Sequence, residues 1–322
     1  MSDTLTIVVP CYNEQEVLPE TVKELGNILQ YLIDNSMVSD QSKILFVNDG
    51  SKDKTWELIS KFSAEKNFVT GIKFSRNYGH QNALLAGMSL AVKYSDMIIT
   101  IDADLQDDVN AIPEMVKKYH EGYDVIYGVR NSRETDTFFK RRTALAFYSL
   151  MKNLGVNLIP DSADYRLLSK RATKALLSFK ERNLFLRGMV PLVGYKSAKV
   201  YYARKERFAG KSKYPLSKML HFALDGITSF SIAPIHLILY LGILTVIISI
   251  ICMIYTLVEK ITGHIVTGWA SLMLSIWFLG GVQLISISII GEYIGKIFSE
   301  VKHRPRFNID VETYTNKMDK SD

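Results

Sequence analysis

The chain has 322 residues, of which 48% are hydrophobic, and its formal net charge at pH 7 is +6. It has no basic tract with interleaved aromatic residues, which argues against a nucleic-acid-binding protein. Its two cysteines, Cys11 and Cys252, provide neither a disulfide framework nor a zinc-ligand spacing. The N-terminal apolar run is too short for a signal peptide and lacks a basic flank, so we expect the domain that it begins to stay in the cytosol.

Strand-like and helix-like segments alternate over the first two-thirds of the chain. We predict strands at 5–9, 43–48, 68–74 and 97–102, and helices at 14–35, 56–62, 80–93 and 110–121. This alternation predicts a mostly parallel sheet with helices on both faces. Ligands of such sheets bind outside the carboxyl ends of the strands, so we expect the functional site at that edge.

Polar motifs follow three of the predicted strands. They are Pro10–Glu14, Asn48–Ser51 and Asp102–Asp108. Each motif alone is compatible with an ordinary turn or helix cap. Three of them at one edge of one sheet favour a binding site.

The third motif contains the carboxylates with the clearest chemical implication. Repulsion between Asp102 and Asp104 makes it costly to ionise both unless a cation lies between them. Hard divalent cations take oxygen ligands, including those of a diphosphate, and Gln106 could supply a further oxygen. The pattern therefore predicts Mg²⁺ or Mn²⁺ with a nucleotide diphosphate. We interpret Asp107 and Asp108 as charges that cap the following helix.

Two long segments near the C-terminus are free of charge. Neither 226–258 nor 261–291 contains Asp, Glu, Lys or Arg, and each exceeds the roughly 20 residues needed to cross a bilayer core. Basic residues cluster at 204–221 and again after Lys296, whereas the short connector holds only Lys260. The positive-inside rule then predicts a hairpin with both ends in the cytoplasm. The alternative is a buried helical hairpin in a soluble protein.

These observations give a domain plan. We expect a cytosolic catalytic domain at 1–215, a juxtamembrane interface helix at 216–231, transmembrane helices at 232–258 and 266–291, and a cytosolic tail at 292–322. The segment 138–154 is either a second membrane-surface helix or an amphipathic helix packed on the sheet. The extended sequence in the tail could add a strand to a partner subunit, or the tail could be disordered.

The motifs resemble those of glycosyltransferase family 2 enzymes with the GT-A fold, in particular the polyprenyl-phosphate glycosyltransferases. The matching pieces are VVPCYNE (8–14), FVNDGSKDKT (46–55), FSRNYGHQNAL (74–84), TIDADLQD (100–107), YGVR (127–130), DSADYRLLSKRA (161–172) and RFAGKSKYPLSKML (207–220). The resemblance implies an α/β, Rossmann-like GT-A catalytic domain followed by a two-helix transmembrane hairpin. Many relatives have Asp at the position of Asn48, which we therefore do not expect to bind a metal.

The resemblance also implies roles for particular residues. Those expected around the nucleotide-sugar or facing its phosphates are Pro10, Tyr12, Asn13, Glu14, Asp49, Arg76, Asp102, Ala103, Arg207 and Lys213. The metal ligands are expected to be Asp102, Asp104 and Gln106. The catalytic residues are expected to be Asp104, Arg130, Asp161 and Asp164. Asp161 and Asp164 match the place of the family's proposed base, although whichever of the two is relevant could instead organise Arg166 or a nearby arginine.

The implied reaction is inverting transfer of a sugar from a nucleotide-sugar, UDP-glucose or UDP-N-acetylglucosamine, to polyprenyl (undecaprenyl) phosphate. The enzyme would be a multi-pass protein of the inner (plasma) membrane with a cytoplasmic catalytic domain, and a homo-oligomer, a tetramer by resemblance. A processive polysaccharide synthase is an alternative, but its Q-x-x-R-W motif is absent. A non-catalytic membrane scaffold is a second alternative. We expect His80 to have a structural or hydrogen-bonding role.

Overall fold

The computed structural model describes residues 2–131, 159–182, 184–204, 233–262 and 268–319. In chain order its elements are β1 (Leu5–Cys11), α1 (Leu18–Asp34), β2 (Lys43–Asn48), α2 (Thr55–Glu65), β3 (Val69–Phe74), α3 (His80–Tyr94), β4 (Met97–Thr100), the 3₁₀ helix η1 (Val109–Ala111), α4 (Ile112–His120), β5 (Val125–Arg130), β6 (Ser162–Ser169), α6 (Lys170–Ser178), α7 (Leu186–Leu192), β7 (Ser197–Tyr202), α9 (Ala233–Ile261), α10 (Trp269–Val301), β8 (Ile309–Glu312) and α11 (Tyr314–Met318).

Within these residues, eight strands form one mixed sheet in the order β7-β5-β6-β4-β1-β2-β3-β8. Strands β1 to β4 are parallel to their neighbours among themselves, as the alternation of segments predicted. Strand β6 runs antiparallel to both β4 and β5. The predicted fourth strand ends at Thr100 rather than at residue 102, so the acidic motif begins in a loop.

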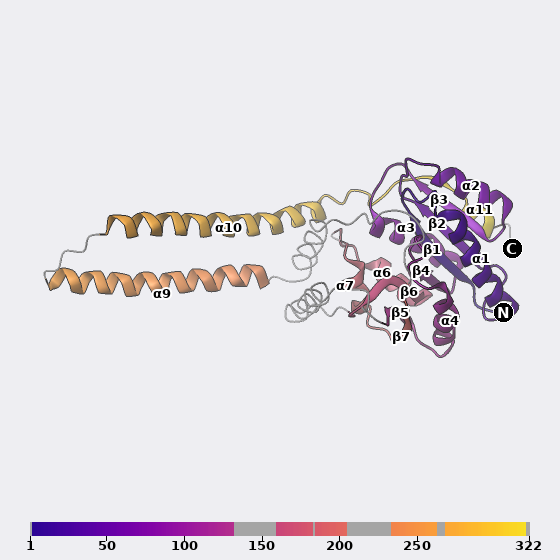
Figure 1. Cartoon of the computed structure of the whole chain (residues 1–322), viewed down its shortest axis with the longest axis horizontal. Helices are drawn as coiled ribbons and strands as arrows, with labels where there is room; N and C mark the ends of the chain where they lie inside the picture. Colours follow the sequence, from indigo (N-terminus) through magenta and orange to yellow (C-terminus); the bar gives the residue numbers. More distant parts are fainter. Residues whose placement is uncertain (1, 132–158, 183, 205–232, 263–267, 320–322) are drawn as a thin grey trace.

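Helices cover both faces of the sheet, and the sheet separates two hydrophobic cores (Figure 1). One core lies under α1, α2 and α4, and the other under α3, α6, α7 and α11. Strand β1 is buried along its whole length because helices pack on both of its faces, which explains its continuous apolar sequence. Gly87 lets α3 lie directly on the sheet, since a Cβ there would be 2.3 Å from Val8 Cγ1.

The reversed strand β6 brings distant residues to the end of β4. Thr100 is paired with Arg166 across the ladder, and its hydroxyl donates a 2.6 Å hydrogen bond to the carbonyl of Asp164. The start of β6 therefore lies beside the acidic loop that follows β4. Strands β5, β6 and β7 were not among the strands that we predicted from the sequence.

Helices α9 and α10 run side by side away from the catalytic domain (Figure 1). Each contains a segment long and apolar enough to cross a membrane, Pro234–Cys252 and Phe278–Val301, and neither segment is buried within the protein. Helix α10 continues past the expected end of the second span at Gly291 as far as Val301. The predicted interface helix at 216–231 and the segment 138–154 lie outside the described residues.

The C-terminal tail folds back onto the catalytic domain. Strand β8 pairs antiparallel with β3 of the same chain, so it extends its own sheet rather than a partner's. After it, the fully buried Tyr314 hydroxyl lies 2.9 Å from Thr6 Oγ1, and Lys317 donates to the carbonyls of Ser63, Lys66 and Val69. The described part of the tail is therefore ordered on the sheet, and the homo-oligomer stays a prediction.

Candidate active site

The loops after β1 and β2 interlock at the carboxyl edge of the sheet. The Asn13 N–H donates to Ser51 Oγ at 3.0 Å, and Asn13 Oδ1 accepts from the Lys52 N–H at 2.9 Å. Asn13 has a φ of 54°, a left-handed conformation that Asn adopts more readily than most residues. Its amide oxygen thus joins the two loops, and Pro10 before it is buried in β1.

Asp49 is buried and fixes the loop before α3. Its two carboxylate oxygens accept the N–H groups of Tyr78 at 2.6 Å and Gly79 at 2.9 Å. Gly50 follows with a φ of 63°, and a Cβ there would be 2.3 Å from the Arg76 carbonyl carbon. These contacts give Asp49 a structural use, and its predicted place beside the nucleotide stays a prediction.

The acidic loop after β4 carries the two carboxylates predicted to bind a metal. Burial, with contributions from Asp107, Asp164 and Asp104, raises the pKa of Asp102 to about 6 despite the opposing effect of His80. Asp102 Oδ1 is buried and accepts no hydrogen bond from any residue that the structure describes. Its nearest ionic partner is His80 Nε2 at 3.5 Å. Such a crowded carboxylate is stabilised by a further cation.

Cations from three elements surround Asp164. It is an ion-pair partner of Arg166 next to it on β6, of His80 at 3.5 Å from the start of α3, and of Arg187 at 3.9 Å from α7. Burial opposes them, yet Arg166 and His80 hold the pKa of Asp164 well below its usual range. Burial likewise acts to lower the pKa of His80, but Asp102 and Asp164 raise it to about 9. The imidazole is therefore cationic at pH 7.

Helix α7 is attached directly to the first turn of α3. The Leu186 N–H donates to Gln81 Oε1 at 2.8 Å. Because Leu186 precedes Arg187 and Gln81 follows His80, this bond holds Arg187 and His80 close together. Arg166 and Arg187 each have a buried Nε without a hydrogen-bond partner among the described residues. The cluster therefore combines three cationic side chains with one carboxylate at the edge of the acidic loop.

Asp107 is not a helix cap, contrary to the sequence interpretation. It is buried and accepts hydrogen bonds from Arg130 Nη2 at 3.0 Å and from the Tyr202 hydroxyl at 2.5 Å. Asp108 alone caps η1, through the Asn110 N–H at 3.2 Å. Arg130, predicted to be catalytic, points its guanidinium at Asp107, because a buried carboxylate needs a partner. Its catalytic role stays a prediction.

Gln106 is also directed differently from the prediction. Its Oε1 accepts a 2.7 Å hydrogen bond from Arg204, at the end of β7. A cationic donor on that oxygen disfavours its use as a metal ligand. Asp104 stays in the loop, where its Oδ1 accepts from the Gln106 N–H at 3.2 Å.

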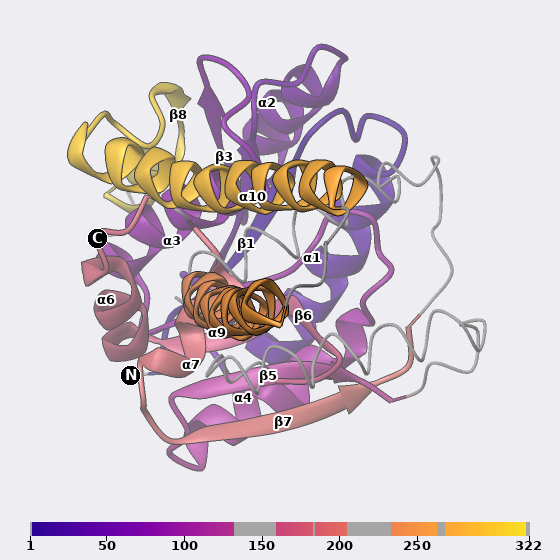
Figure 2. The same cartoon turned by 90° about the vertical axis from the view of Figure 1, so that its left-hand side faces the viewer.

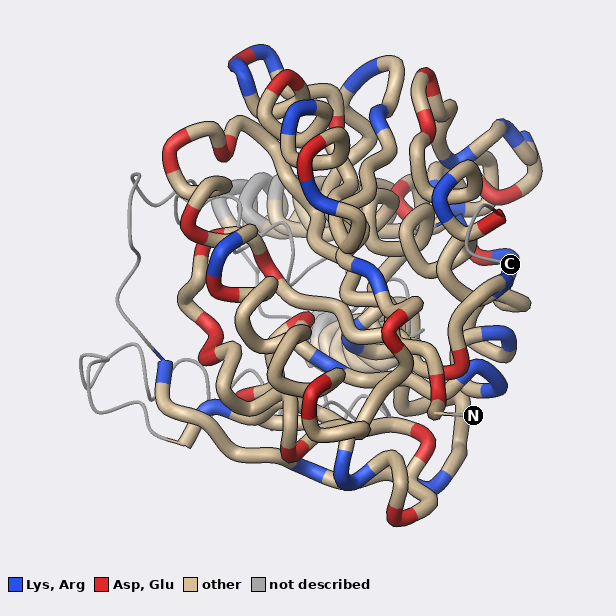
Figure 3. The backbone as a smooth tube through the Cα atoms, turned by 90° about the vertical axis from the view of Figure 1, so that its right-hand side faces the viewer, with Lys and Arg blue, Asp and Glu red and all other residues tan. Residues whose placement is uncertain are grey.

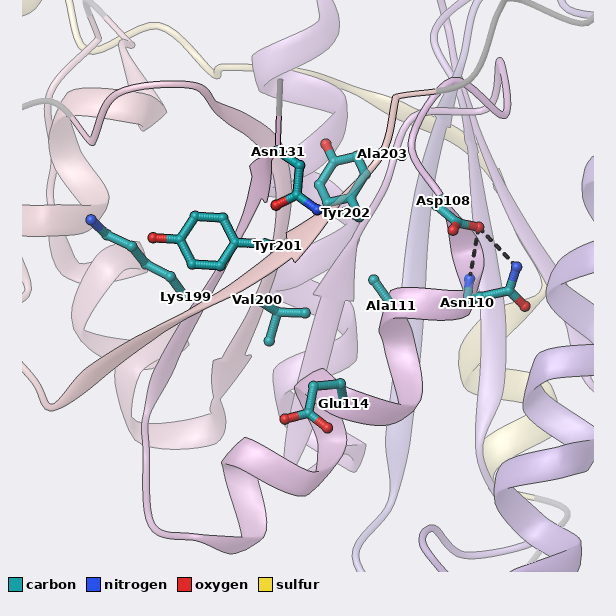
Figure 4. A pocket seen from close by; sticks show the side chains of 10 residues that line it. All are labelled: Asp108, Asn110, Ala111, Glu114, Asn131, Lys199, Val200, Tyr201, Tyr202 and Ala203. Carbon is teal, nitrogen blue, oxygen red and sulfur yellow. Dashed lines mark hydrogen bonds between the residues drawn. The ribbon is translucent and has the colours of Figure 1, made fainter. Parts of the chain in front are cut away.

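A cavity of about 470 Å³ lies between η1, α4 and β7 (Figure 4). Its lining includes Asp108, Asn131 and Tyr201 but neither Asp102 nor Asp104. Asn131 adjoins a chain segment outside the described residues, and Ala203 lies two residues before another. The cavity therefore adjoins the acidic loop at Asp108 but does not include the two carboxylates predicted to bind a metal.

The structure brings most of the predicted residues to one edge, and it adds two that the sequence analysis missed. Tyr12 and Glu14 follow β1, and the exposed Arg76 stacks on Tyr78 with its guanidinium carbon 4.2 Å from the ring centroid. Asp161, at the turn before β6, accepts the Arg130 N–H through its carbonyl. The two added residues are Arg187, which had no motif, and His80, for which we expected a structural or hydrogen-bonding role rather than a place in the site. Arg207 and Lys213 lie outside the described residues.

The acidic loop fits a divalent cation, although the described residues contain no group of three His, Cys, Asp or Glu arranged to hold one. Its available ligands are carboxylate oxygens, which suit Mg²⁺ or Mn²⁺, and Asp102 has a buried oxygen without a hydrogen bond. The remaining ligands would have to come from a bound diphosphate or from water.

A mixed α/β sheet with an acidic loop at its carboxyl edge is the arrangement of the GT-A glycosyltransferases, and this chain is such an enzyme. Residues 6–177 match the family described as Glycosyl transferase family 2, and the chain belongs to that family.

Relatives align over nearly the full chain. The uncharacterized glycosyltransferase YkoT of Bacillus subtilis is 56% identical over 314 residues, which cover 98% of this chain and 93% of that protein. A bactoprenol glucosyl transferase of Shigella phage SfV is 38% identical and covers 96% of this chain and 98% of its own length.

Solved structures resemble the chain more distantly. Glucosyl-3-phosphoglycerate synthase from Mycobacterium tuberculosis, in complex with uridine-diphosphate, matches 71% of this chain and 79% of its own at 18% identity and a TM-score of 0.45. The mannosyltransferase PcManGT from Pyrobaculum calidifontis matches 95% of this chain and 89% of its own at 13% identity and a TM-score of 0.43.

Proposed function

We propose that this enzyme transfers a sugar, with inversion, from a UDP-sugar to the phosphate of a polyprenyl lipid at the cytoplasmic face of the plasma membrane. The observation that carries the proposal is the acidic loop, with a buried Asp102 oxygen that lacks a hydrogen bond among the described residues, next to a cationic cluster. The similarity to a phage bactoprenol glucosyl transferase supports a polyprenyl acceptor and glucose as the sugar.

Asp102 and Asp104 would hold Mg²⁺ or Mn²⁺, with the diphosphate of the donor completing the ligand set. When bound, the cation would neutralise the negative charge that develops on the departing diphosphate. The side chains that are already in place keep this edge of the sheet rigid: Asp49 fixes the loop at 76–79, and Asp107 fixes the acidic loop against β5 and β7. A fixed arrangement lowers the reorganisation needed in the transition state.

The acceptor determines what the protein has to supply. A phosphate monoester has a second pKa near about 6, so a lipid phosphate is largely dianionic at pH 7 and needs no strong base. One of its oxygens bonds to the anomeric carbon as the bond to the diphosphate breaks on the opposite face, and no proton is transferred. Two anions meet in this step, so His80 and Arg187 are suited to orient the acceptor and to reduce the repulsion.

The two apolar helices support a location at the membrane. Arg204, at the end of β7, bonds to Gln106 in the acidic loop, and the chain then continues toward α9. The acidic loop is thus tied to the segment that leads into the first candidate span. This connection suits a donor site that has to act on a lipid substrate.

The test is a glycolipid assay with the purified full chain. UDP-glucose, UDP-N-acetylglucosamine and GDP-mannose are each supplied with undecaprenyl phosphate and Mn²⁺, and the products are weighed by mass spectrometry. We expect one singly glycosylated lipid phosphate, with loss of product when the metal is chelated. Polymeric product would support a processive synthase instead, and donor binding without turnover on any lipid phosphate would support a non-catalytic scaffold.

A further inference from the structure

A second cavity, of about 460 Å³, lies where the chain leaves α10. Its apolar part consists of Leu85 on α3, Leu177 and Phe179 at the end of α6, and Phe307 after α10. Phe307 is held by stacking on Phe74, with ring centroids 5.2 Å apart and an interplanar angle of 11°. None of the residues that line this groove belongs to the candidate active site. We call it the α3–α10 groove.

The polar part of the α3–α10 groove is basic. Lys180, Arg182 and Arg306 contribute positive charges, and His303 adds an imidazole. Arg306 is held in place by hydrogen bonds from Nη2 to the carbonyls of Phe179 and Glu181, at 2.8 and 2.7 Å. Burial and the nearby Arg182 lower the pKa of Arg306, against the opposing effect of Glu300 and Glu181.

The acidic residues near the groove do not balance this charge. The Glu300 carboxylate accepts the Arg182 N–H at 2.6 Å, and Glu300 and Glu181 are the acidic residues that act on Arg306. Lys302 and Arg304 add two further basic residues on the connecting segment. By contrast, the face of the domain turned away from the hairpin carries both signs of charge interspersed (Figure 3). At this end five basic residues, Lys180, Arg182, Lys302, Arg304 and Arg306, outnumber two acidic ones, Glu181 and Glu300.

The groove lies next to the place where α10 leaves the candidate span Phe278–Val301, because His303 and Arg306 follow that helix at once. Figures 1 and 2 both place this end of α10 on the side of the domain that carries α3 and α6. An apolar floor with a basic rim at the surface of a bilayer matches a lipid that has an acidic headgroup.

We propose that the α3–α10 groove binds the headgroup of an anionic phospholipid of the surrounding membrane. The lipid phosphate would lie against Lys180, Arg182 and Arg306, and the glycerol and first acyl carbons would cover Leu177, Phe179 and Phe307. Such a lipid would hold the loop at 179–182, and with it the base of α7, against the membrane surface.

The experiment measures lipid binding rather than sugar transfer, so its outcome does not depend on the proposed reaction. The detergent-purified full chain is titrated with phosphatidylglycerol or with phosphatidylcholine of the same acyl chains, and bound lipid is counted by native mass spectrometry. The groove variant is Lys180→Gln/Arg182→Gln. The control variant, Lys23→Gln/Lys61→Gln, removes the same charge from exposed positions on α1 and α2, and thermal unfolding checks that both variants fold.

We expect wild type and control to prefer phosphatidylglycerol, and the groove variant to bind it about 30-fold more weakly, the order expected for the loss of two basic residues at an anionic surface. Equal binding by the groove and control variants would overturn the proposal. So would displacement of the lipid by inorganic phosphate at equal concentration, which would identify a simple anion site. If the double variant is unfolded, Lys180→Gln alone, at an exposed position, gives the same comparison with Lys61→Gln.

Discussion

Asp164 lies among Arg166, His80 and Arg187, and these neighbours determine its chemistry. A carboxylate whose pKa is held well below its usual range binds protons weakly, so it is a poor general base. The sequence left open whether Asp161 or Asp164 acts as a base, or instead organises Arg166 or a nearby arginine. The ion pair with Arg166 confirms the contact with that arginine, and the proposed phosphate acceptor has no proton that must be removed.

The first prediction compares two carboxylates of the site. We expect Asp104→Asn to lower kcat by about 10²–10³-fold, because it removes electrostatic stabilisation of the leaving diphosphate. We expect Asp164→Asn to keep measurable turnover, with a loss of about 10–100-fold, because an amide can still orient the neighbouring cations. Initial rates of glycolipid formation at saturating donor check both values. Equal and complete loss of activity in both folded variants would contradict this assignment.

The second prediction concerns stability and pH. Arg171, together with Ser169, lowers the pKa of the buried Asp124. A carboxylate with a lowered pKa in the folded state stabilises the fold above its unfolded pKa of about 3.9, and this contribution is lost as the pH falls through the folded pKa. Arg171→Gln should therefore lower the melting temperature at pH 7, on the order of 2 °C for an exposed arginine.

The difference between wild type and Arg171→Gln should narrow as the pH approaches and passes below about 4. Scanning fluorimetry from pH 7 downward measures it. Lys170→Gln is the matched control, because its ammonium group lies 3.9 Å from the more exposed Asp96 and should give little change at any pH. A difference that grows as the pH falls would have the wrong sign for this ion pair.

At the scale of elements, the acidic loop is fastened to two strands that reach it from elsewhere in the chain. Asp107 accepts from Arg130 at the end of β5 and from Tyr202 at the end of β7. The sequence suggested a cap for Asp107 because the only visible neighbour was the helix that follows. Its real partners are 23 and 95 residues away, and no local pattern indicates such a contact.

The third prediction tests this attachment. Tyr202→Phe removes the 2.5 Å hydrogen bond to Asp107 and keeps the ring in the core. We expect the Mn²⁺ concentration for half-maximal activity to rise by about tenfold, since outer partners of a metal site typically matter at that level. The neighbouring Tyr201 is exposed, so Tyr201→Phe should leave the metal requirement unchanged. An unchanged requirement in both variants would separate Asp107 from metal binding.

The sequence predicts those parts of the fold and of the site whose signals lie in residues near one another in the chain. The strands at β1 to β4 and helices α1 to α4 follow from apolar periodicity, and the carboxyl-edge rule correctly gathers the loops at Asn13, Asp49 and Asp102. The cationic cluster does not follow, because β6 reverses direction and α7 brings Arg187 from a segment with no motif of its own. His80 had one usable signal, its place at the start of a helix on that same edge.

At the scale of the whole molecule, the tail completes the sheet after the chain has passed through the hairpin. Tyr314 is fully buried beneath α3, and its hydroxyl contacts Thr6 and Ser95. Residues at the end of the chain thus complete the core that residues at its beginning start to build.

The fourth prediction measures this contribution. Tyr314→Ala should destabilise the catalytic domain by about 3–5 kcal/mol, as expected for removal of a large buried ring. Tyr314→Phe should cost only about 1 kcal/mol, because the ring remains and only hydrogen bonds are lost. Urea unfolding followed by tryptophan fluorescence gives both values, with the half-exposed Tyr31→Ala as control. If Tyr314→Ala lowered the free energy of unfolding no more than Tyr31→Ala does, the tail would not be part of the folded core.

The order of the strands has a mechanical consequence. The chain departs toward α9 from β7, at one margin of the sheet, and returns from α10 to β8, at the opposite margin. With neighbouring strands about 4.8 Å apart, these two attachments are separated by roughly 30 Å. A domain that is connected to the membrane at one point can rotate freely about it. A domain that is connected at two separated points can only tilt about the line that joins them. Approach of the enzyme's reactive edge to its lipid would then be a tilt about that line.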